Sequence, residues 1–175
     1  MSNWFVFFVQ TGKEQVVCNY FNERLNEKGL AAFFPKVQLV YKTSKQVRKE
    51  LKPMFPGYIF AETDLDARSI AIQTSQMVRT SKHLFKLLGN ENSDYMPLHE
   101  EEKAFLLKFC DEAYIVRESK GLKKGDKVLV TSGPLQGKES IIKRIDRHRR
   151  RAEIELRLMG DTRRVSLSLE IVEKV

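Results

Sequence analysis

The sequence predicts an α+β domain followed by a small β-barrel, and three observations carry this prediction. An aromatic and β-branched run, W-F-V-F-F-V-Q at residues 4–10, has the length of a strand, and helical patterns follow it in the N-terminal two thirds. The last third instead holds short alternating runs separated by turn residues, which is typical of a small barrel. The net charge is also divided unevenly between these two parts.

The N-terminal run lacks polar alternation, so we expect a strand that is covered on both faces. Thr11 and Glu14 match a capping box, in which the threonine hydroxyl accepts from the N–H of Glu14 and the glutamate reaches back to the N–H of Thr11. The helix that follows should end at Gly29, because glycine adopts the left-handed conformation of a helix stop.

A second strand is predicted over residues 31–41 and an exposed basic hairpin tip over 42–49. Pro53 and Pro56 forbid regular central pairing, so regular pairing should resume at Tyr58. The other elements expected in this α+β domain are helices over 63–75 and 100–110 and a short strand over 84–88.

The last third predicts five short strands, which suit a closed or nearly closed barrel. The expected strands cover 127–131, 140–145, 152–158, 165–169 and 171–175. We therefore expect one domain over residues 1–113, a linker over 114–122 and a barrel over 123–175.

The charge distribution indicates an acidic partner. The chain has 31 Lys+Arg and 23 Asp+Glu, a net charge of +8. Residues 1–118 hold 16 Lys+Arg and 15 Asp+Glu, a net charge of +1. Residues 119–175 hold 15 Lys+Arg and 8 Asp+Glu, a net charge of +7. Such asymmetry favours nucleic acid as the partner of the last third, with a basic surface kept for solubility as the alternative.

Several classes of protein are disfavoured by the sequence. No apolar run approaches the ~20 residues that a bilayer requires, so we expect no membrane partner. The start has no signal-peptide pattern, and the two cysteines, Cys18 and Cys110, suit a reducing cytoplasm. With no phosphate-binding loop, no G-x-S-x-G and no metal-ligand spacing, we expect no enzyme, no catalytic residue, no cofactor and no metal.

Two motifs carry a resemblance to a known family. The segment G-D-K-V-L-V-T-S-G-P-L-Q-G-K-E at 125–139 resembles the KOW motif, and the tryptophan-led first strand with P-M-F-P-G-Y-I-F at 53–60 resembles the N-terminal domain of NusG. Together they resemble the NusG family of transcription elongation factors over nearly the whole chain. The resemblance implies an NGN-type α+β domain with an antiparallel sheet and helices, then an SH3-like KOW barrel. The KOW positions matched are Gly125, Asp126, Val128, Val130, Gly133, Pro134, Leu135 and Gly137.

Within this family, two segments resemble the LoaP antiterminators, a specialised branch. One is I-K-R-I-D-R-H-R-R-R-A-E-I-E-L at 142–156, and the other is G-K-E at 12–14. The resemblance implies a factor that suppresses pausing and termination. The alternatives are a housekeeping NusG-type factor, whose barrel binds a termination factor or a ribosomal protein, and a ribosome-associated KOW protein.

The resemblance also implies a docking surface for RNA polymerase. NusG-type N-terminal domains bind the clamp helices of the largest polymerase subunit through an exposed apolar patch. The positions that match this patch are Phe8, Phe55 and Leu88. Phe55 lies in an irregular, proline-flanked segment, where its ring can stay outside a regular sheet. The alternative is that Phe8 and Phe55 are ordinary core residues.

A basic cluster predicts the RNA-binding site. Residues 143–151, K-R-I-D-R-H-R-R-R, lie between two β-runs and so form a hairpin tip, and five of their six cations are arginine. Because aromatic residues are absent from this part of the chain, a structured RNA hairpin is favoured over a single strand. A solvated basic loop is the alternative. The predicted RNA-binding residues are Lys123, Lys124, Lys143, Arg144, Arg147, His148, Arg149, Arg150, Arg151, Arg163 and Arg164.

A second basic set is a candidate for contact with upstream or non-template DNA, and a solvated hairpin tip is the alternative. This set is Lys42, Lys45, Arg48, Lys49 and Arg79. The expected protein is a monomeric transcription antitermination factor with RNA polymerase and a nascent RNA hairpin as its partners.

Overall fold

A computed structural model describes residues 2–89, 92 and 94–174. The chain forms two compact units that interleave along the sequence. Unit 1 comprises Met1–Phe34 and Phe55–Lys103, and unit 2 comprises Pro35–Met54 and Ala104–Val175.

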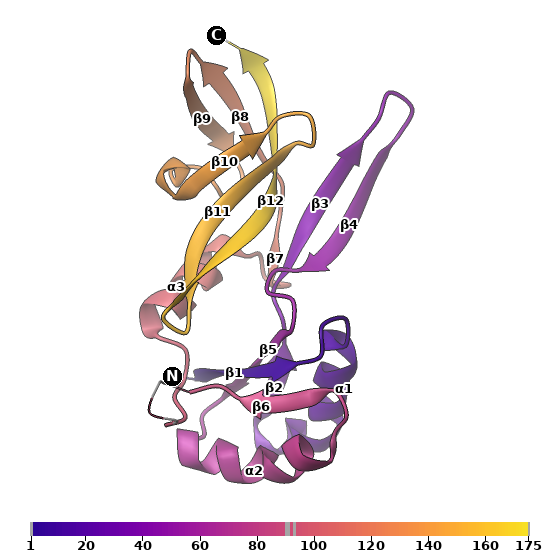
Figure 1. The fold of residues 1–175 in the computed structure, drawn as a ribbon, viewed down its shortest axis with the longest axis vertical. Helices are drawn as coiled ribbons and strands as arrows, with labels where there is room; N and C mark the ends of the chain where they lie inside the picture. The colour runs from indigo at the N-terminus through magenta and orange to yellow at the C-terminus, as the bar shows by residue number, and fades with distance from the viewer. Residues whose placement is uncertain (1, 90–91, 93, 175) are drawn as a thin grey trace. The chain divides into compact units, whose positions relative to one another are not determined.

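Unit 1 is an antiparallel sheet with two helices on one face (Figure 1). The sheet order is β2-β5-β1-β6, so the N-terminal strand lies in the middle. The strands are β1 (Asn3–Val9), β2 (Leu30–Phe33), β5 (Tyr58–Thr63) and β6 (Leu84–Leu87). The helices are α1 (Glu14–Leu25) and α2 (Ala67–Thr80), with a 3-10 turn, η1 (Asn26–Lys28), after the first. The predicted α+β domain is therefore confirmed.

Alternation along β1 divides the unit 1 core between the two faces of the sheet. Phe5, Phe7 and Val9 point to the helices and pack with Phe21 of α1 and Ile70 of α2. On the opposite face, the Trp4 ring lies 4.9 Å from the Phe33 ring in an edge-on contact, and Val6 is fully buried. The strand is thus covered on both faces, as its uninterrupted apolar run predicts.

The capping box expected at the start of α1 is wrong. The N-cap residue is Lys13, with no side-chain cap. The Glu14 carboxylate is buried and accepts from the N–H of Gly12 and, 43 residues along the chain, from the N–H of Gly57, each at 2.9 Å. The N–H of Gly12 therefore takes the place of the expected N–H of Thr11, and a distant backbone donor in a tight turn occupies the other carboxylate oxygen. The helix expected from residue 63 instead begins at Ala67, because Asp66 caps it by accepting from the N–H of Ser69.

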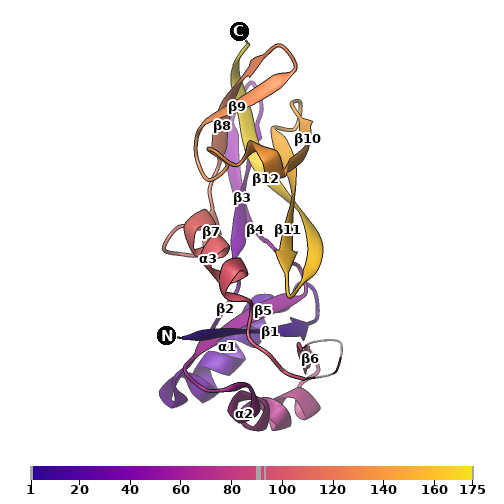
Figure 2. The same ribbon diagram turned by 90° about the vertical axis from the view of Figure 1, so that its left-hand side faces the viewer.

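Unit 2 contains two sheets and most of a helix. The larger sheet has the order β10-β11-β12-β8-β9 (Figure 2). Its strands are β8 (Ser119–Lys124), β9 (Lys127–Ser132), β10 (Ile142–Asp146), β11 (Arg151–Leu158) and β12 (Asp161–Lys174), with a 3-10 turn, η2 (Glu139–Ile141), before β10. Closure of these strands into a barrel stays a prediction. The boundary between the units falls within α3 (Glu100–Phe109).

The KOW-like turn of unit 2 has the backbone that its glycines predict. Gly133 has φ +92, and a Cβ there would lie 2.6 Å from the carbonyl oxygen of Glu118. The N–H of Leu135 donates to the Ser119 hydroxyl at 3.0 Å, and the Leu135 side chain is fully buried. Glycine is therefore required at 133 both by its conformation and by the close approach of a neighbouring strand.

The smaller sheet of unit 2 contains a hairpin from the N-terminal part of the chain. It has the order β4-β3-β7, with β3 (Lys36–Lys42), β4 (Val47–Pro53) and β7 (Ile115–Val116). The β3–β4 hairpin, predicted within the domain over 1–113, thus belongs to unit 2. The segment 114–122, predicted as a linker, contains β7 and the start of β8, because its backbone pairs with β3 and β12.

The last predicted strand extends to the end of the described residues. The strand predicted over 171–175 is the last part of β12, and Val175 lies outside the described residues. No helix in the described part of the chain is long and apolar enough to span a membrane.

Candidate functional sites

An aromatic cluster lies on the sheet face of unit 1 that the helices leave uncovered. Phe8 of β1 is paired with Tyr58 of β5, and their rings are 5.6 Å apart. The Phe85 ring of the neighbouring strand β6 lies 5.2 Å from Phe8. Phe85 is 45% exposed, and the other two rings are partly exposed. We call Phe8, Tyr58 and Phe85 the aromatic cluster.

The predicted docking residues fall in three different environments. Phe8 is the centre of the aromatic cluster. Leu88 is partly buried, and its N–H donates to the Val6 carbonyl at 2.8 Å. The expectation of an exposed Phe55 is wrong, since this residue is only 4% exposed.

A tight turn explains the burial of Phe55. The N–H of Tyr58 donates to the carbonyl oxygen of Phe55 at 3.1 Å, and Gly57 has φ +87. Proline followed by a left-handed glycine is the pattern of a type II turn. The Phe55 ring stacks on Phe60, 6.1 Å away, so the prolines do not leave it outside the sheet.

Tyr58 and Phe85 are surface residues outside the predicted docking set. Tyr58 has a detectable signal, because it alternates with the buried Ile59 along one strand. Phe85 has a weaker signal, since β6 is short and its face is decided by its pairing with β1.

The basic cluster at 143–151 forms a hairpin, as predicted. Strands β10 and β11 pair from Ile142 to Asp146, and a turn of exposed basic residues joins them. The Asp146 carboxylate accepts from the N–H of Arg149 at 3.0 Å, and this hydrogen bond lowers the pKa of Asp146. The Arg149 side chain is 83% exposed. We call residues 147–150 the basic turn.

Arg150 and Arg151 make contacts inside unit 2. The Arg151 guanidinium donates to the Val40 carbonyl at 2.9 Å and to the Ser168 hydroxyl at 3.2 Å, and it lies 4.9 Å from the centre of the Tyr41 ring. Arg150 donates to the Lys42 carbonyl at 3.3 Å. These two predicted RNA-binding side chains are therefore already engaged by the β3–β4 hairpin.

The remaining predicted RNA-binding residues do not all gather at the basic turn. Lys143, Arg144, Arg147 and His148 are exposed on or beside it. Arg163 and Arg164 lie five and four positions from Ser168 on β12, which pairs with Arg151 at the turn end of β11. At ~3.3 Å per residue, this places them well along the strand from the basic turn. Arg164 is also paired with Glu155 at 3.2 Å, and Lys123 and Lys124 lie at the end of β8.

The candidate DNA-contacting residues separate into two groups. Arg79 is exposed on α2 of unit 1, whereas the other four belong to the β3–β4 hairpin of unit 2. In the hairpin, Lys42 is paired with Glu170 at 2.9 Å and Arg48 with Glu50 at 3.2 Å. Lys45 and Lys49 are exposed.

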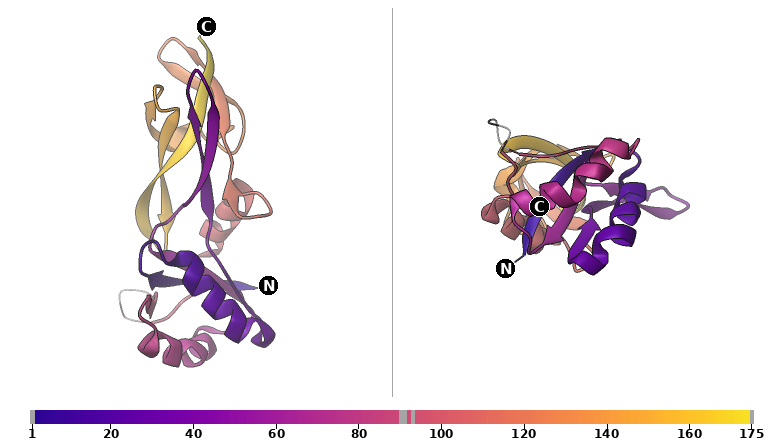
Figure 3. Two further views of the ribbon diagram at one scale, coloured as in Figure 1. Left: turned by 90° about the vertical axis from the view of Figure 1, so that its right-hand side faces the viewer. Right: turned by 90° about the horizontal axis from the view of Figure 1, so that it is seen from below.

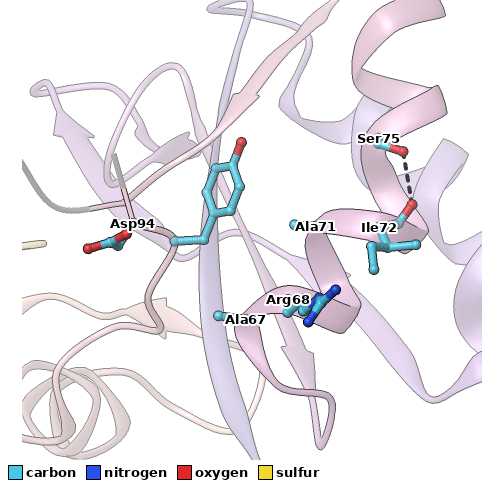
Figure 4. Close-up of a pocket in the computed structure, with 7 residues that line it drawn as sticks. Ala67, Arg68, Ala71, Ile72, Ser75 and Asp94 are labelled. Carbon is cyan, nitrogen blue, oxygen red and sulfur yellow. Dashed lines mark hydrogen bonds between the residues drawn. The ribbon is translucent and has the colours of Figure 1, made fainter. Parts of the chain in front are cut away.

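Unit 1 also has a groove along α2, which Figure 4 shows in close-up. Its lining includes Arg68, Ile72 and Ser75 of the helix and Asp94 of another segment. The Ser75 hydroxyl donates to the Ile72 carbonyl at 2.9 Å. Among the described residues, no group of three His, Cys, Asp or Glu side chains can hold a metal ion.

Comparison with known proteins gives two family matches and several relatives. Residues 2–107 match the model described as "Transcription termination factor nusG", and residues 124–155 match the KOW motif. The chain is 22% identical over 178 residues to the transcription termination/antitermination protein NusG of Pseudomonas aeruginosa, covering 98% of each chain. It is 21% identical over 178 residues to NusG of Haemophilus influenzae, covering 98% of this chain and 94% of that protein.

One solved structure supports the fold. Its title is "Domain interaction in Thermotoga maritima NusG", and it aligns with a TM-score of 0.51 at 19% identity. The alignment covers 96% of this chain and 94% of that one.

Proposed function

Because the chain belongs to the NusG family of transcription elongation and termination factors, we propose that it is an antitermination factor that binds both RNA polymerase and a structured nascent RNA. Unit 1 docks on the clamp helices of the largest polymerase subunit. The basic turn of unit 2 binds an RNA hairpin, which recruits the factor to chosen transcripts. The predicted result is less pausing and less termination.

The aromatic cluster supports docking on the polymerase. Aromatic side chains dominate many protein interfaces, because each buries a large apolar area with little loss of conformational freedom. Phe8, Tyr58 and Phe85 come from three adjacent strands, so the sheet itself holds their spacing. An apolar stripe of a partner helix can bury such a cluster.

The exposure of the basic turn is the observation that carries RNA binding. Arg147, His148 and Arg149 are exposed at the tip of the β10–β11 hairpin, and Lys143 and Arg144 are exposed on β10. Guanidinium groups bind phosphate oxygens with two hydrogen bonds and also read the edge of guanine. The sequence after Tyr114 has no aromatic residue on which unpaired bases could stack, which favours a paired stem.

The experiment that tests this proposal compares the full chain with a variant in which Arg147 and Arg149 are both replaced by Gln. The probe is a fully paired RNA stem-loop, and fluorescence anisotropy at several salt concentrations gives the affinity and its salt slope. We expect weaker binding and a slope lower by about two, because each lost phosphate contact removes almost one released counterion. Unchanged affinity and slope would reject RNA binding by the basic turn.

A second candidate function has its own supporting observation. Leu129 of β9 and Val172 of β12 are 55% and 57% exposed in the larger sheet of unit 2. Exposed apolar side chains of this kind suit a protein partner, such as a termination factor or a ribosomal protein. Loss of protein binding after Leu129→Ser, with RNA binding unchanged, would favour the housekeeping alternative.

A further inference from the structure

The basic charge of the chain is concentrated in unit 2. This concentration is stronger than the one between residues 1–118 and 119–175 of the sequence. Unit 2 holds 23 Lys+Arg and 12 Asp+Glu, a net of +11, whereas unit 1 holds 8 and 11, a net of −3. The difference from the +1 of residues 1–118 and the +7 of residues 119–175 comes largely from the β3–β4 hairpin. Its six cations against one acid join the unit that carries the basic turn.

Side chains of the larger sheet cover the open backbone edge of β3. The N–H of Val40 donates to the buried Ser168 hydroxyl at 2.9 Å, and the Val40 carbonyl accepts from Arg151 at 2.9 Å. The Lys42 carbonyl, which lies two residues further along the same edge, accepts from Arg150 at 3.3 Å. Backbone groups of alternate residues point to the same edge of a strand, so these side chains replace a missing partner strand. Strand β3 contacts β12, which lies behind the hairpin in the left view of Figure 3, and Figure 1 shows the tip of the hairpin pointing away from β12.

One carboxylate of the same junction lies between two of its cations. The Glu170 carboxylate lies 2.9 Å from the Lys42 ammonium and 3.7 Å from the Arg150 guanidinium. The hydrogen bond from Lys42 lowers the pKa of Glu170, and the charge of Arg150 lowers it further, so this carboxylate stays ionised at neutral pH. The Arg48 and Arg151 guanidinium groups both lie over the Tyr41 ring, 4.8 and 4.9 Å from its centre. Two cations thus occupy the ring that an unpaired base would need for stacking.

Exposed cations flank the residues of this junction along the chain. Lys45 follows Lys42 by three residues, and Arg147 and Arg149 precede Arg150 by three and one. A segment of three residues spans at most ~10 Å, and the Arg150 side chain with its 3.3 Å hydrogen bond to Lys42 bridges the rest, so the backbones of Lys45 and Arg147 are within about 30 Å of each other. This is short enough for one nucleic-acid stem to contact both tips.

We propose that the β3–β4 hairpin and the basic turn form a single phosphate-binding surface for a base-paired RNA stem. Lys45 and Lys49 contact phosphates together with Arg147 and Arg149. Arg150 and Arg151 are positioning residues that hold the hairpin against the larger sheet. This inference rests on the proposed RNA binding. It assigns Lys45 and Lys49, which the sequence made candidates for DNA contact, to the RNA-binding surface.

The first test replaces Lys45 and Lys49 by Gln in the full chain. The matched control replaces Lys28 and Lys82, two exposed lysines of unit 1, by Gln, so both variants lose the same charge. Anisotropy with a fully paired RNA stem-loop should show a salt slope lower by about two for the hairpin variant and little change for the control. A DNA duplex of the same length and the unpaired RNA strand serve as comparison probes.

The outcomes separate this inference from the proposed function. If the hairpin variant binds like its control while the Arg147/Arg149 variant loses affinity, the composite surface is rejected and RNA binding by the turn stands. If neither variant loses affinity, the proposed RNA binding fails too. A loss on the DNA duplex alone returns the lysines to a DNA role and rejects the inference.

A second variant tests positioning without changing any charge. Ser168→Ala removes the acceptor of the Val40 N–H and one acceptor of Arg151. We expect weaker RNA binding, with a salt slope close to that of the Lys45/Lys49 variant. Combining Ser168→Ala with the Lys45/Lys49 replacements should add no further loss of affinity. Circular dichroism and the thermal midpoint establish that the variant is folded. A folded Ser168→Ala protein with unchanged affinity and slope would contradict the positioning role.

Discussion

Arg151 donates to the Val40 carbonyl over 2.9 Å, although 111 residues separate them along the chain. The contact joins the start of β11 to the open edge of β3, and the Ser168 hydroxyl completes it from β12. An arginine that the sequence places among RNA-binding residues is therefore part of the structure of unit 2. Its hydrogen bonds and its contact with Tyr41 leave fewer donors for a ligand.

Replacing Arg151 by Ala should lower the free energy of unfolding by about 1–3 kcal/mol, because a buried carbonyl loses a charged donor. Urea unfolding measures the change. Arg157→Ala, an exposed arginine on the same strand, is the control and should cost less. Equal costs for the two variants would mean that the Val40 contact contributes nothing.

Replacing Phe85 by Ala should weaken binding to RNA polymerase by about tenfold or more, because the docking surface loses one of its aromatic contacts. Its side chain is 45% exposed, so the fold should be retained. Ile72→Ala, a 64% exposed residue of the same unit, is the control. Co-sedimentation with purified polymerase gives the comparison, and equal affinities would remove Phe85 from the docking surface.

Replacing Phe55 by Ala should destabilise the protein by about 3–5 kcal/mol, because truncation of a buried aromatic leaves a cavity. The residue is 4% exposed and stacked on Phe60. Denaturant unfolding is the measurement. A stable Phe55→Ala protein that has lost polymerase binding would instead support the direct contact expected from the sequence.

Cys110 should resist alkylation in the folded protein. Burial raises the pKa of its thiol from 9.0 to about 12, and the neighbouring Asp111 charge adds to this shift. Since the thiolate is the reactive form, iodoacetamide at pH 8 should modify this cysteine only after unfolding. The stability that the protonated thiol contributes is complete below pH 9 and is lost as the pH rises towards 12. Rapid modification at pH 8, located by mass spectrometry, would contradict the burial.

Replacing Gly133 by Ala should cost more than replacing Gly125 by Ala. Both have positive φ, which costs a non-glycine residue roughly 1–2 kcal/mol. At Gly133 the new Cβ would also lie 2.6 Å from the Glu118 carbonyl oxygen, whereas nothing lies within 4 Å at Gly125. Thermal unfolding of the two variants isolates the steric part of the cost, and equal shifts would rule that part out.

Local pattern was sufficient for several elements. The unbroken apolar run of β1 predicts burial on both faces, and the basic cluster between two alternating runs predicts a hairpin tip. The glycines of the KOW-like segment predict a tight turn, since positive φ is a property of single residues. Each of these features depends on neighbours in the chain, so the sequence by itself determined them.

Tertiary structure decided the features that depend on distant partners. The turn at Pro56 and Gly57 buries Phe55 on Phe60, which proline positions alone do not indicate. The β3–β4 hairpin joins unit 2 because Ser168 and Arg151 cover its open edge more than a hundred residues away. Backbone groups at a strand edge must find partners somewhere, and the sequence does not say where. The +8 of the whole chain is therefore a property of composition, whereas its concentration as +11 on one unit is a property of the fold.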